Sequence, residues 1–396
     1  MSEFIDSCFD ADVMVVGGGV IGLASAIAMR LRDCSVTLLD AGDLDVSAVS
    51  HNTRVYAINH ASQKLLTQLG VWETIAIDVR TPYQGMYIWD AKNKAKITFE
   101  ARDIAAAEMG FMLEESVLRT ALLKRADSLG VALIGDARVV GCTEKKVGMQ
   151  LITDDERARH AKLCMIADGA RSKTRDLLKV PMNTWSYHHD ALVATVRTEK
   201  PHQAIAYQVF CSDGPLAFLP LKDPHQCSIV WSHPPEQIKA LMTLEDSAFN
   251  AALTQAFSNK LGRVEVMTPR VSFPLHMRHV TEYRGASWVL LGDAAHTIHP
   301  LAGLGLNVGL ADLQAWLNLL AQQKNKIGSV RMLDAYQRER KSEVWGVIML
   351  MQAIKAMFGT AAAPIEFARG IGMRMLNQVG PLKRMLMTYA AGVDKE

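Results

Sequence analysis

A glycine-rich turn near the N-terminus constrains the fold of this chain more than any other sequence feature. Residues 17–22 read GGGVIG and fit the pattern G-x-G-x-x-G. The turn directly follows an apolar run at 11–16, and it precedes an apolar stretch at 20–31 and a second short run at 36–39. These patterns predict a strand, a tight turn, a helix and a second strand that ends at Asp40.

Three glycines and one acid would carry the chemistry of this unit. Gly17 permits the tight turn, Gly19 lets the backbone approach a pyrophosphate, and Gly22 lets the helix pack closely on the strand. The free N–H groups at the helix start can bind the anion, and Asp40 can accept hydrogen bonds from a ribose. The unit predicts a bound dinucleotide, with a plain tight turn as the weaker alternative. It does not distinguish NAD(P) from FAD.

The composition excludes several classes of protein. The 396 residues are 49% hydrophobic, and 43 Lys and Arg against 41 Asp and Glu leave a formal charge of +2. Such a chain has ample material for a buried core in two or three domains, which excludes disorder and collagen-like repeats. The balanced charge and the lack of a basic run argue against a nucleic-acid partner. No spacing typical of metal ligands is present, so we expect no metal site.

The sequence also predicts where the protein resides. Its six cysteines are scattered without a C-x-x-C pair, which favours reduced thiols. The N-terminus lacks the basic and apolar regions of a signal peptide. The longest apolar tract, Val344 to Ile365, is interrupted by polar residues and falls short of a membrane span. We therefore expect a cytoplasmic protein that does not cross a bilayer.

The remaining patterns outline the rest of the fold. Helices are predicted at 62–69, closed by Gly70, and at 114–129, closed by Gly130. Short alternating segments between about 181 and 275 predict an antiparallel sheet. A strand at 288–291 then leads into a loop and a helix, and the chain beyond Arg331 reads as helical.

Two later segments carry a resemblance to a known family. Residues 163–175 (LCMIADGARSKTR) resemble the "DG" motif of class A flavoprotein aromatic hydroxylases, and residues 292–300 (GDAAHTIHP) resemble their "GD" motif. Together with the glycine-rich turn, the order and spacing of these motifs are similar to those of the para-hydroxybenzoate-hydroxylase superfamily. Within it, the chain resembles the ubiquinone-biosynthesis ring hydroxylases of the UbiH/UbiF/VisC type. The resemblance extends from about residue 12 to the C-terminal helices.

This resemblance implies an α/β fold. It consists of a Rossmann-like FAD-binding domain with an inserted β-sheet substrate domain and C-terminal helices. We expect the discontinuous FAD-binding domain at 1–80, 101–180 and 276–330. The substrate-binding sheet domain is expected at 81–100 and 181–275, and the helical region at 331–396.

The resemblance implies FAD as the cofactor and assigns residues to it. Asp293, just after a strand, would hold the flavin's ribityl hydroxyls, and Arg54 would approach the pyrophosphate. Asp168 would line the region where FAD and the nicotinamide reductant meet, together with Arg175. The alternatives without a functional role are a turn cap for Asp293, a solvated surface arginine for Arg54, and a structural ion pair for Asp168 and Arg175.

A second group of cofactor residues opens the helix after the GD motif. The positive end of that helix would face the negative charge of a reduced flavin. Its expected cofactor-binding residues are Gly303, Gly305, Leu306 and Asn307. The chain departs from the family where it has Leu304 in place of the glutamine in G-Q-G. It also departs at Glu115, where relatives often carry a neutral or basic FAD contact, so that contact is not carried over.

The implied reaction is monooxygenation of an aromatic ring. No second G-x-G-x-x-G follows a strand, so no bound NADPH domain is encoded. The resemblance implies that NAD(P)H or another donor reduces FAD and that O2 adds at flavin C4a. The resulting hydroperoxide would transfer oxygen to a phenolic ring, while the protein supplies orientation and water exclusion. His299 and Pro300 would form the loop over the flavin's reactive edge. A general base at His296 or His299 is weighed against a purely structural role.

The end of the chain bears on the substrate. Between Val347 and Met387 lie seven methionines, five basic residues and one acid, an excess of +4. This segment could hold the protein at the inner face of a membrane as a peripheral contact, or its methionines could simply pack in a core. A polyprenylated phenol or quinone precursor prefers lipid to water. The expected partners are this lipid, O2, the electron donor and other ubiquinone-biosynthesis proteins.

Three functions remain open at this point. The first is ring hydroxylation in ubiquinone biosynthesis. The second is a flavoenzyme of the same fold on another substrate, either a soluble phenolic hydroxylase or a prenyl reductase. The third is a flavin-bearing assembly subunit without catalysis.

Overall fold

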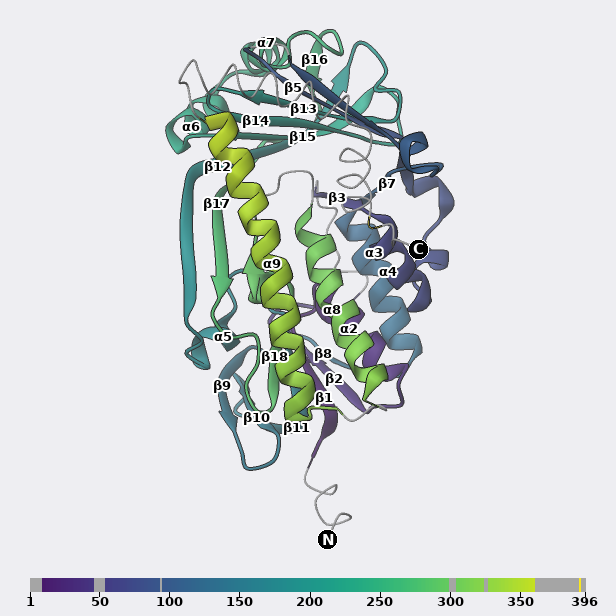
Figure 1. Cartoon of the computed structure of the whole chain (residues 1–396), viewed down its shortest axis with the longest axis vertical. Helices are drawn as coiled ribbons and strands as arrows, with labels where there is room; N and C mark the ends of the chain where they lie inside the picture. The colour runs from purple at the N-terminus through teal and green to yellow at the C-terminus, as the bar shows by residue number, and fades with distance from the viewer. Residues whose placement is uncertain are drawn as a thin grey trace.

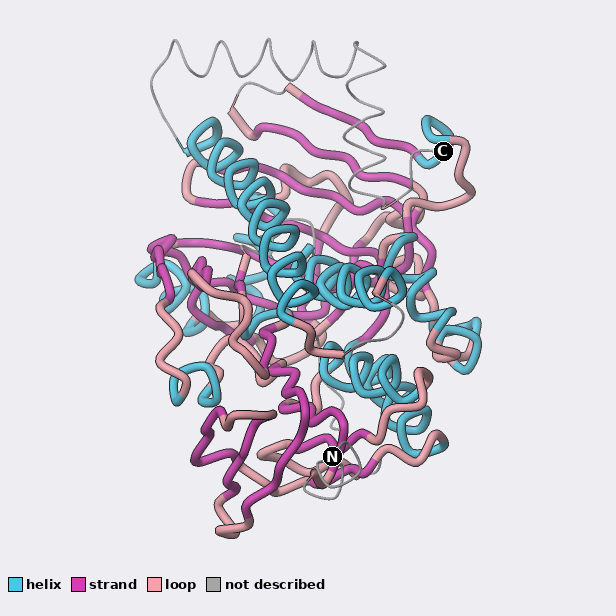
Figure 2. Tube along the Cα trace, turned by 60° about the horizontal axis from the view of Figure 1, so that its bottom comes forward, coloured by secondary structure: helices cyan, strands magenta, loops and turns pink. Residues whose placement is uncertain are grey.

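The computed structural model describes residues 9–45, 54–92, 95–298, 304–323, 327–359 and 392 (Figure 1). Within them, no helix combines the length and the apolar character needed to span a bilayer. The strands form three sheets, of seven, nine and three strands. Figure 2 shows the two larger groups of strands toward opposite ends of the molecule, with helices between them.

The seven-stranded sheet contains the predicted strand, turn, helix and strand. Its strands β8, β2, β1, β11 and β18 run parallel, and β10 and β9 extend it in antiparallel pairing beyond β11. Their bounds are β1 (Ala11–Val16), β2 (Val36–Leu39), β8 (Ala132–Ile134), β9 (Val139–Glu144), β10 (Met149–Thr153), β11 (Ala158–Ile166) and β18 (Trp288–Leu290). The apolar runs read from the sequence are therefore the central, fully buried strands, as parallel strands covered on both faces require.

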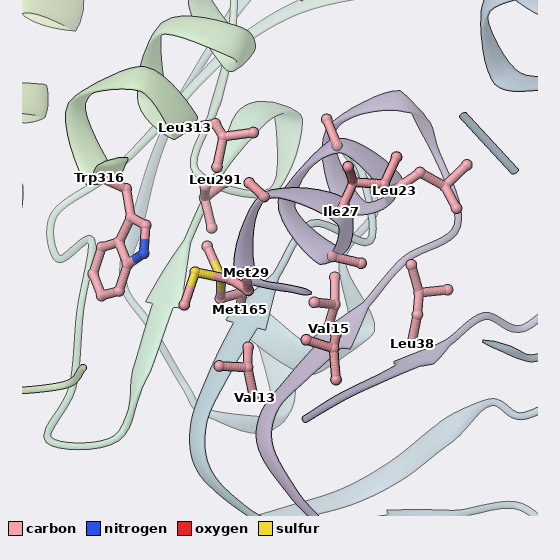
Figure 3. Close-up of a cluster of buried hydrophobic side chains, with 14 of the residues drawn as sticks. Val13, Val15, Leu23, Ile27, Met29, Leu38, Met165, Leu291, Leu313 and Trp316 are labelled. Carbon is pink, nitrogen blue, oxygen red and sulfur yellow. The ribbon is translucent and has the colours of Figure 1, made fainter. Parts of the chain in front are cut away.

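Helices cover this sheet and form the largest core with it. They are α2 (Val20–Arg30), α3 (His60–Gln68), α4 (Glu115–Ser128) and α8 (Leu304–Gln322), with the short α5 (Lys173–Leu177) after β11. Figure 3 shows side chains of β1, α2 and α8 meeting in this core, among them Val15, Ile27 and Trp316. Gly70 and Gly130 have φ of +67° and +70°, the left-handed conformation that closes a helix.

A three-stranded sheet lies beside this unit. Strand β7 (Gly110–Glu114) pairs on one side with β3 (Val55–Ile58) and on the other with β4 (Thr81–Tyr83). Short 3-10 turns connect the elements around it, at Trp72–Thr74, Ile77–Val79 and Ala101–Ile104.

The nine-stranded sheet is mostly antiparallel, and Figure 1 shows it at the top of the molecule and extending down the left side. Its order is β19, β17, β12, β15, β14, β13, β5 and β6, and β16 pairs with β12. The bounds are β5 (Gly85–Asp90), β6 (Lys96–Glu100), β12 (Met182–Thr198), β13 (Ile205–Cys211), β14 (Gly214–Pro220), β15 (Gln226–His233), β16 (Val264–Val266), β17 (Val271–Val280) and β19 (His296–Thr297). Helices α6 (Pro235–Thr243) and α7 (Asp246–Ala256) cover one face, and Ile238 of α6 and Phe249 of α7 join its core.

The long helix α9 (Val330–Gly359) links the two larger sheets. Met332 and Tyr336 at its start belong to the core of the parallel sheet. Val344 and Ile348, further along, pack against β12 and β17. Figure 1 shows α9 running along the length of the molecule from one sheet to the other.

The predicted α/β fold class is confirmed, with two local differences. Residues 181–275 contain α6 and α7 as well as the predicted antiparallel strands. Ile238 and Leu241 in α6, and Phe249 and Leu253 in α7, recur at the three- and four-residue spacing of a helix, a signal that the prediction of strands alone overlooked. Strand β4 pairs with β7 rather than with the large sheet, and β17 crosses the expected boundary at 275. The domain limits themselves stay a prediction.

Candidate functional site

The glycine turn brings the ends of three strands together. Gly17 has φ of +113° and donates its N–H to Leu39 O at 2.8 Å. A Cβ at Gly17 would lie 2.3 Å from Ala167 O, which follows β11. A Cβ at Gly22 would lie 1.8 Å from Gly17 O. Both positions therefore require glycine because backbone already fills the space.

Gly19 differs from these two glycines because its missing side chain leaves open space. Within the part of the chain that the structure describes, a Cβ there would meet no atom within 4 Å. Gly19 is also the N-cap of α2, and the first turn of that helix carries no acidic side chain. The unpaired N–H groups of the turn are thus accessible to an anion, which helix N-termini favour.

Asp40 directly follows β2 and lies beside this turn. Its Oδ1 accepts the N–H of Gly42 at 2.8 Å, and its Oδ2 accepts the N–H of Gly18. Each carboxylate oxygen has a further lone pair that can accept from a ribose hydroxyl. The loop is held in addition by Arg119 of α4, whose Nε donates to Gly18 O at 3.0 Å. No motif in the sequence pointed to Arg119, because its role depends on how α4 packs against α2.

The DG segment lies at the same edge of the sheet. Asp168 Oδ2 accepts the N–H of Thr174 at 3.1 Å, while its Oδ1 is buried without a hydrogen-bond partner among the described residues. Arg175 does not pair with Asp168 in the described structure. It forms an ion pair with Asp176 at 3.1 Å and donates to Ala294 O at 3.2 Å. Arg175 therefore ties the DG segment to the GD segment.

The GD segment follows β18 as a short 3-10 turn, Gly292–Ala294. Burial raises the pKa of Asp293, and the nearby guanidinium of Arg54 offsets this only in part. Arg54 is 58% exposed, and its Nε lies 4.0 Å from Glu115 Oε2. Its guanidinium also lies 5.1 Å from the Tyr56 ring centre. Glu115, the departure noted in the sequence, is thus a partner of the predicted cofactor arginine.

The start of α8 meets the same place. A Cβ at Gly305 would meet no atom of the described residues within 4 Å, whereas one at Gly309 would lie 3.2 Å from the Gly292 Cα. Asn307 directs its side chain into the protein: its Nδ2 donates to Ala57 O at 2.7 Å, and its Oδ1 accepts from Ser62 Oγ at 2.8 Å. Its backbone, rather than its amide, is what the helix start can offer to a ligand.

The remaining predicted residues divide into two groups. Leu306 is half-buried and packs against the core of the parallel sheet. His299, Pro300 and Gly303 lie outside the described residues, as does most of the methionine-rich segment. The roles assigned to individual site residues stay predictions.

A buried network behind the GD turn was missed by sequence reasoning. Asp312 of α8 accepts the Gly292 N–H at 2.8 Å and the His296 Nε2–H at 2.7 Å on Oδ2. Its Oδ1 accepts from Arg340 Nε of α9 at 2.7 Å. Although burial acts to raise the pKa of Asp312, the neighbouring His296 and Arg340 hold that pKa below its ordinary value. The His296 side chain is therefore held inside the protein by its hydrogen bond to Asp312.

Taken together, these groups fit a flavin dinucleotide. An open glycine at a helix start, an acid after β2 and a second open glycine at the start of α8 match its pyrophosphate, ribose and ring. The unpartnered Asp168 Oδ1 and the half-buried Asp293 carboxylate supply acceptors for further hydroxyl groups. No group of His, Cys, Asp and Glu in the described part of the chain could hold a metal ion.

Comparison with known proteins agrees with this reading. The FAD binding domain family matches residues 10–351. The chain is 31% identical to the ubiquinone hydroxylase UbiL of Rhodospirillum rubrum, over 97% of this chain and 90% of that protein. It is 30% identical to the 3-demethoxyubiquinol 3-hydroxylase of Escherichia coli K12, over 96% of this chain and 98% of that protein.

Solved structures show the same fold at lower identity. The p-nitrophenol 4-monooxygenase PnpA of Pseudomonas putida superposes with a TM-score of 0.80 and 17% identity, over 97% of this chain and 99% of that one. The complex of aklavinone-11 hydroxylase with FAD and aklavinone gives a TM-score of 0.70 and 19% identity, over 88% of this chain and 69% of that one.

Proposed function

The chain belongs to the FAD-binding domain family, and from this premise we propose that it hydroxylates the aromatic ring of a polyprenylated phenol in ubiquinone biosynthesis. The family and the FAD cofactor inferred from the sequence motifs are confirmed by these matches. The observation that carries the proposal is the similarity to ubiquinone hydroxylases over nearly the whole chain. It is combined with the arrangement of the turn, DG and GD segments, which meet at one edge of the parallel sheet, here called the cofactor edge.

The residues that would hold FAD come from separate parts of the chain. Gly19 and the start of α2 would face the pyrophosphate, and Asp40 the ribose. Asp293 and the start of α8 would face the ribityl chain and the flavin ring. When bound, FAD supplies the redox and oxygen chemistry of the reaction. The protein's own tasks are to orient the ring, to keep out water and to stabilise charge.

The start of α8 is suited to the last of these tasks. Because no Cβ stands at Gly305, a planar ligand can approach the backbone there closely. The partial positive charge of a helix N-terminus stabilises negative charge that develops on a neighbouring ring. Asn307 holds this end of the helix against β3 and α3 through Ala57 and Ser62, so the position is fixed before the ligand arrives.

A polyprenyl substrate also bears on where the protein works. Each buried CH2 contributes about 0.8 kcal/mol, so a tail of a few isoprene units strongly favours lipid. In α9, Met351 packs with Ile298 in a core cluster, whereas Met349 is 60% exposed. Met351 is thus an example of core packing, and Met349 is an example of an exposed methionine that could contact a membrane. A peripheral contact with the membrane surface is part of the proposal.

The decisive experiment traces whether an oxygen atom from O2 enters the aromatic ring. The purified holoprotein would be given NAD(P)H, 18O2 and a short-chain prenylated phenol, and the product would be analysed by mass spectrometry. The proposal expects a product whose ring carries one 18O atom and which forms only when the phenol is present. A protein that stays colourless with excess FAD would contradict it, and so would reoxidation without any oxygen in the ring. Flotation with anionic vesicles tests the membrane contact separately.

A further inference from the structure

Gln208 is a buried polar side chain on the inner face of the nine-stranded sheet. It lies in β13 and is only 6% exposed. Its neighbours Tyr207 and Val209 belong to the core that the sheet forms with α7. Because successive side chains of a strand point to opposite faces, Gln208 points away from α7.

The surroundings of Gln208 on that face are apolar. It stands opposite Ile88 of β5 and Ala217 of β14, and Ala217 in turn stands opposite Val230 of β15. No hydrogen bond joins its amide to any other residue of the described structure. An amide offers two donors and an acceptor, and most buried polar side chains satisfy at least one of them. The amide of Gln208 is therefore available to hydrogen-bond a ligand that reaches this face of the sheet.

Two clusters on either side of Gln208 connect this face to the cofactor edge. Ala206, two residues before it on the same face, packs in a cluster with Ala57 of β3. Val230 and Val308, the latter in the second turn of α8, both pack against a cluster formed by β12, β17 and α9. Gln208 thus lies on the sheet face that packs toward β3 through Ala206 and that shares a cluster with the first turns of α8 through Val230.

From this placement we propose that Gln208 determines substrate specificity by hydrogen bonding to the hydroxyl oxygen of the aromatic ring. This inference rests on the proposed function, which supplies a phenol beside the flavin. The amide can accept the phenolic O–H and donate an N–H to the same oxygen. A site built to hydrogen-bond a hydroxyl group rejects a ring that lacks it, because the buried amide is then left unpaired.

The test pairs a change in the protein with a matched change in the ligand. Binding of 2-prenylphenol and of prenylbenzene, which lacks the hydroxyl group, would be measured through the absorbance of the oxidised flavin. The wild-type holoprotein is expected to prefer the phenol by about tenfold. Gln208→Met keeps the length of the side chain but removes the amide, and it is expected to bind the two ligands with equal affinity.

Controls separate this effect from damage to the fold. Gln150→Met, in β10 of the other sheet, is expected to keep the full preference for the phenol. The flavin spectrum and the thermal midpoint of Gln208→Met should match those of the wild type. The wild type provides a test that needs no variant, because equal affinity for the two ligands would already overturn the assignment.

The outcomes also distinguish this inference from the proposed function. If oxygen enters the ring but Gln208→Met keeps the preference for the phenol, the role of Gln208 is wrong and the reaction stands. If the wild type prefers the phenol and Gln208→Met loses that preference, yet no oxygen is inserted, the role of Gln208 holds and the proposed reaction is wrong.

Discussion

Asp312 and His296 form a buried hydrogen-bonded pair, with the His296 Nε2 2.7 Å from the Asp312 Oδ2. The same carboxylate oxygen accepts the N–H of Gly292, the first residue of the GD turn. Two consequences follow from this geometry. Asp312 fixes the turn that presents Asp293, and it does so from behind, without itself facing the cofactor edge. A charge inside α8 thereby positions a residue that precedes the helix in the chain.

Loss of the Asp312 charge should destabilise the whole protein. Asp312→Asn leaves the buried guanidinium of Arg340 without its main counter-charge, and breaking a buried pair in this way costs about 3–5 kcal/mol. Urea unfolding measures the loss. The matched control is Glu343→Gln, because that partner of Arg340 is 57% exposed and should cost less than about 1 kcal/mol. Equal losses in the two variants would contradict the central role of Asp312.

Stability should fall in mild acid because of His279. Burial, with His296 and Lys341 nearby, lowers the pKa of His279 from 6.5 to about 4. The unfolded chain therefore binds a proton below about pH 6.5 that the folded protein refuses until about pH 4. The contribution of neutral His279 is present above pH 6.5 and is lost as the pH falls through this window, by roughly 3 kcal/mol.

A variant that cannot titrate tests this prediction. His279→Phe keeps a ring beside Tyr283 and Trp345 but removes the proton site. Its unfolding free energy, measured by urea titration between pH 7 and pH 4, should decline less steeply than that of the wild type. Parallel curves for the two proteins would refute the assignment.

Substitutions at two glycines of the turn should have different effects, one on cofactor binding alone and the other on protein stability as well. Gly19→Ala places a methyl group in open space, so the apoprotein should unfold at the wild-type urea concentration while its affinity for FAD falls at least tenfold. Gly22→Ala drives a methyl group into Gly17 O, so it should lower the stability of the apoprotein as well. Flavin fluorescence titration and urea unfolding provide the two measurements. Identical behaviour of the variants would show that the turn does not discriminate between these roles.

Asp293 is expected to lower the stability of the apoprotein while it strengthens the binding of FAD. Burial raises the pKa of its carboxyl group, so the charged form at neutral pH is unfavourable in the apoprotein. Asp293→Asn removes that charge and is expected to stabilise the apoprotein by about 0.5–1 kcal/mol while weakening FAD binding. Thermal unfolding with and without added FAD measures both effects. A variant that loses stability in the apo state would contradict the prediction.

Local sequence was sufficient wherever a motif and its structure lie in one short segment. The run 11–16, the turn at Gly17 and the strand ending at Asp40 could be predicted because the periodicity of side chains and the conformational freedom of glycine act over a few residues. Helix ends at Gly70 and Gly130 follow the same rule. The family and the cofactor could be inferred from three such segments together.

Tertiary structure alone decided which distant residues share a site. Arg119 supports the glycine turn from α4, Arg175 joins the DG and GD segments, and Asn307 turns inward to β3 instead of outward. The pairing of Asp312 with His296 and Arg340, and the placement of Gln208 on an apolar strip, likewise have no local signature. The physical reason is that hydrogen bonds and burial depend on which elements pack together, and packing is set by contacts between residues far apart in the chain.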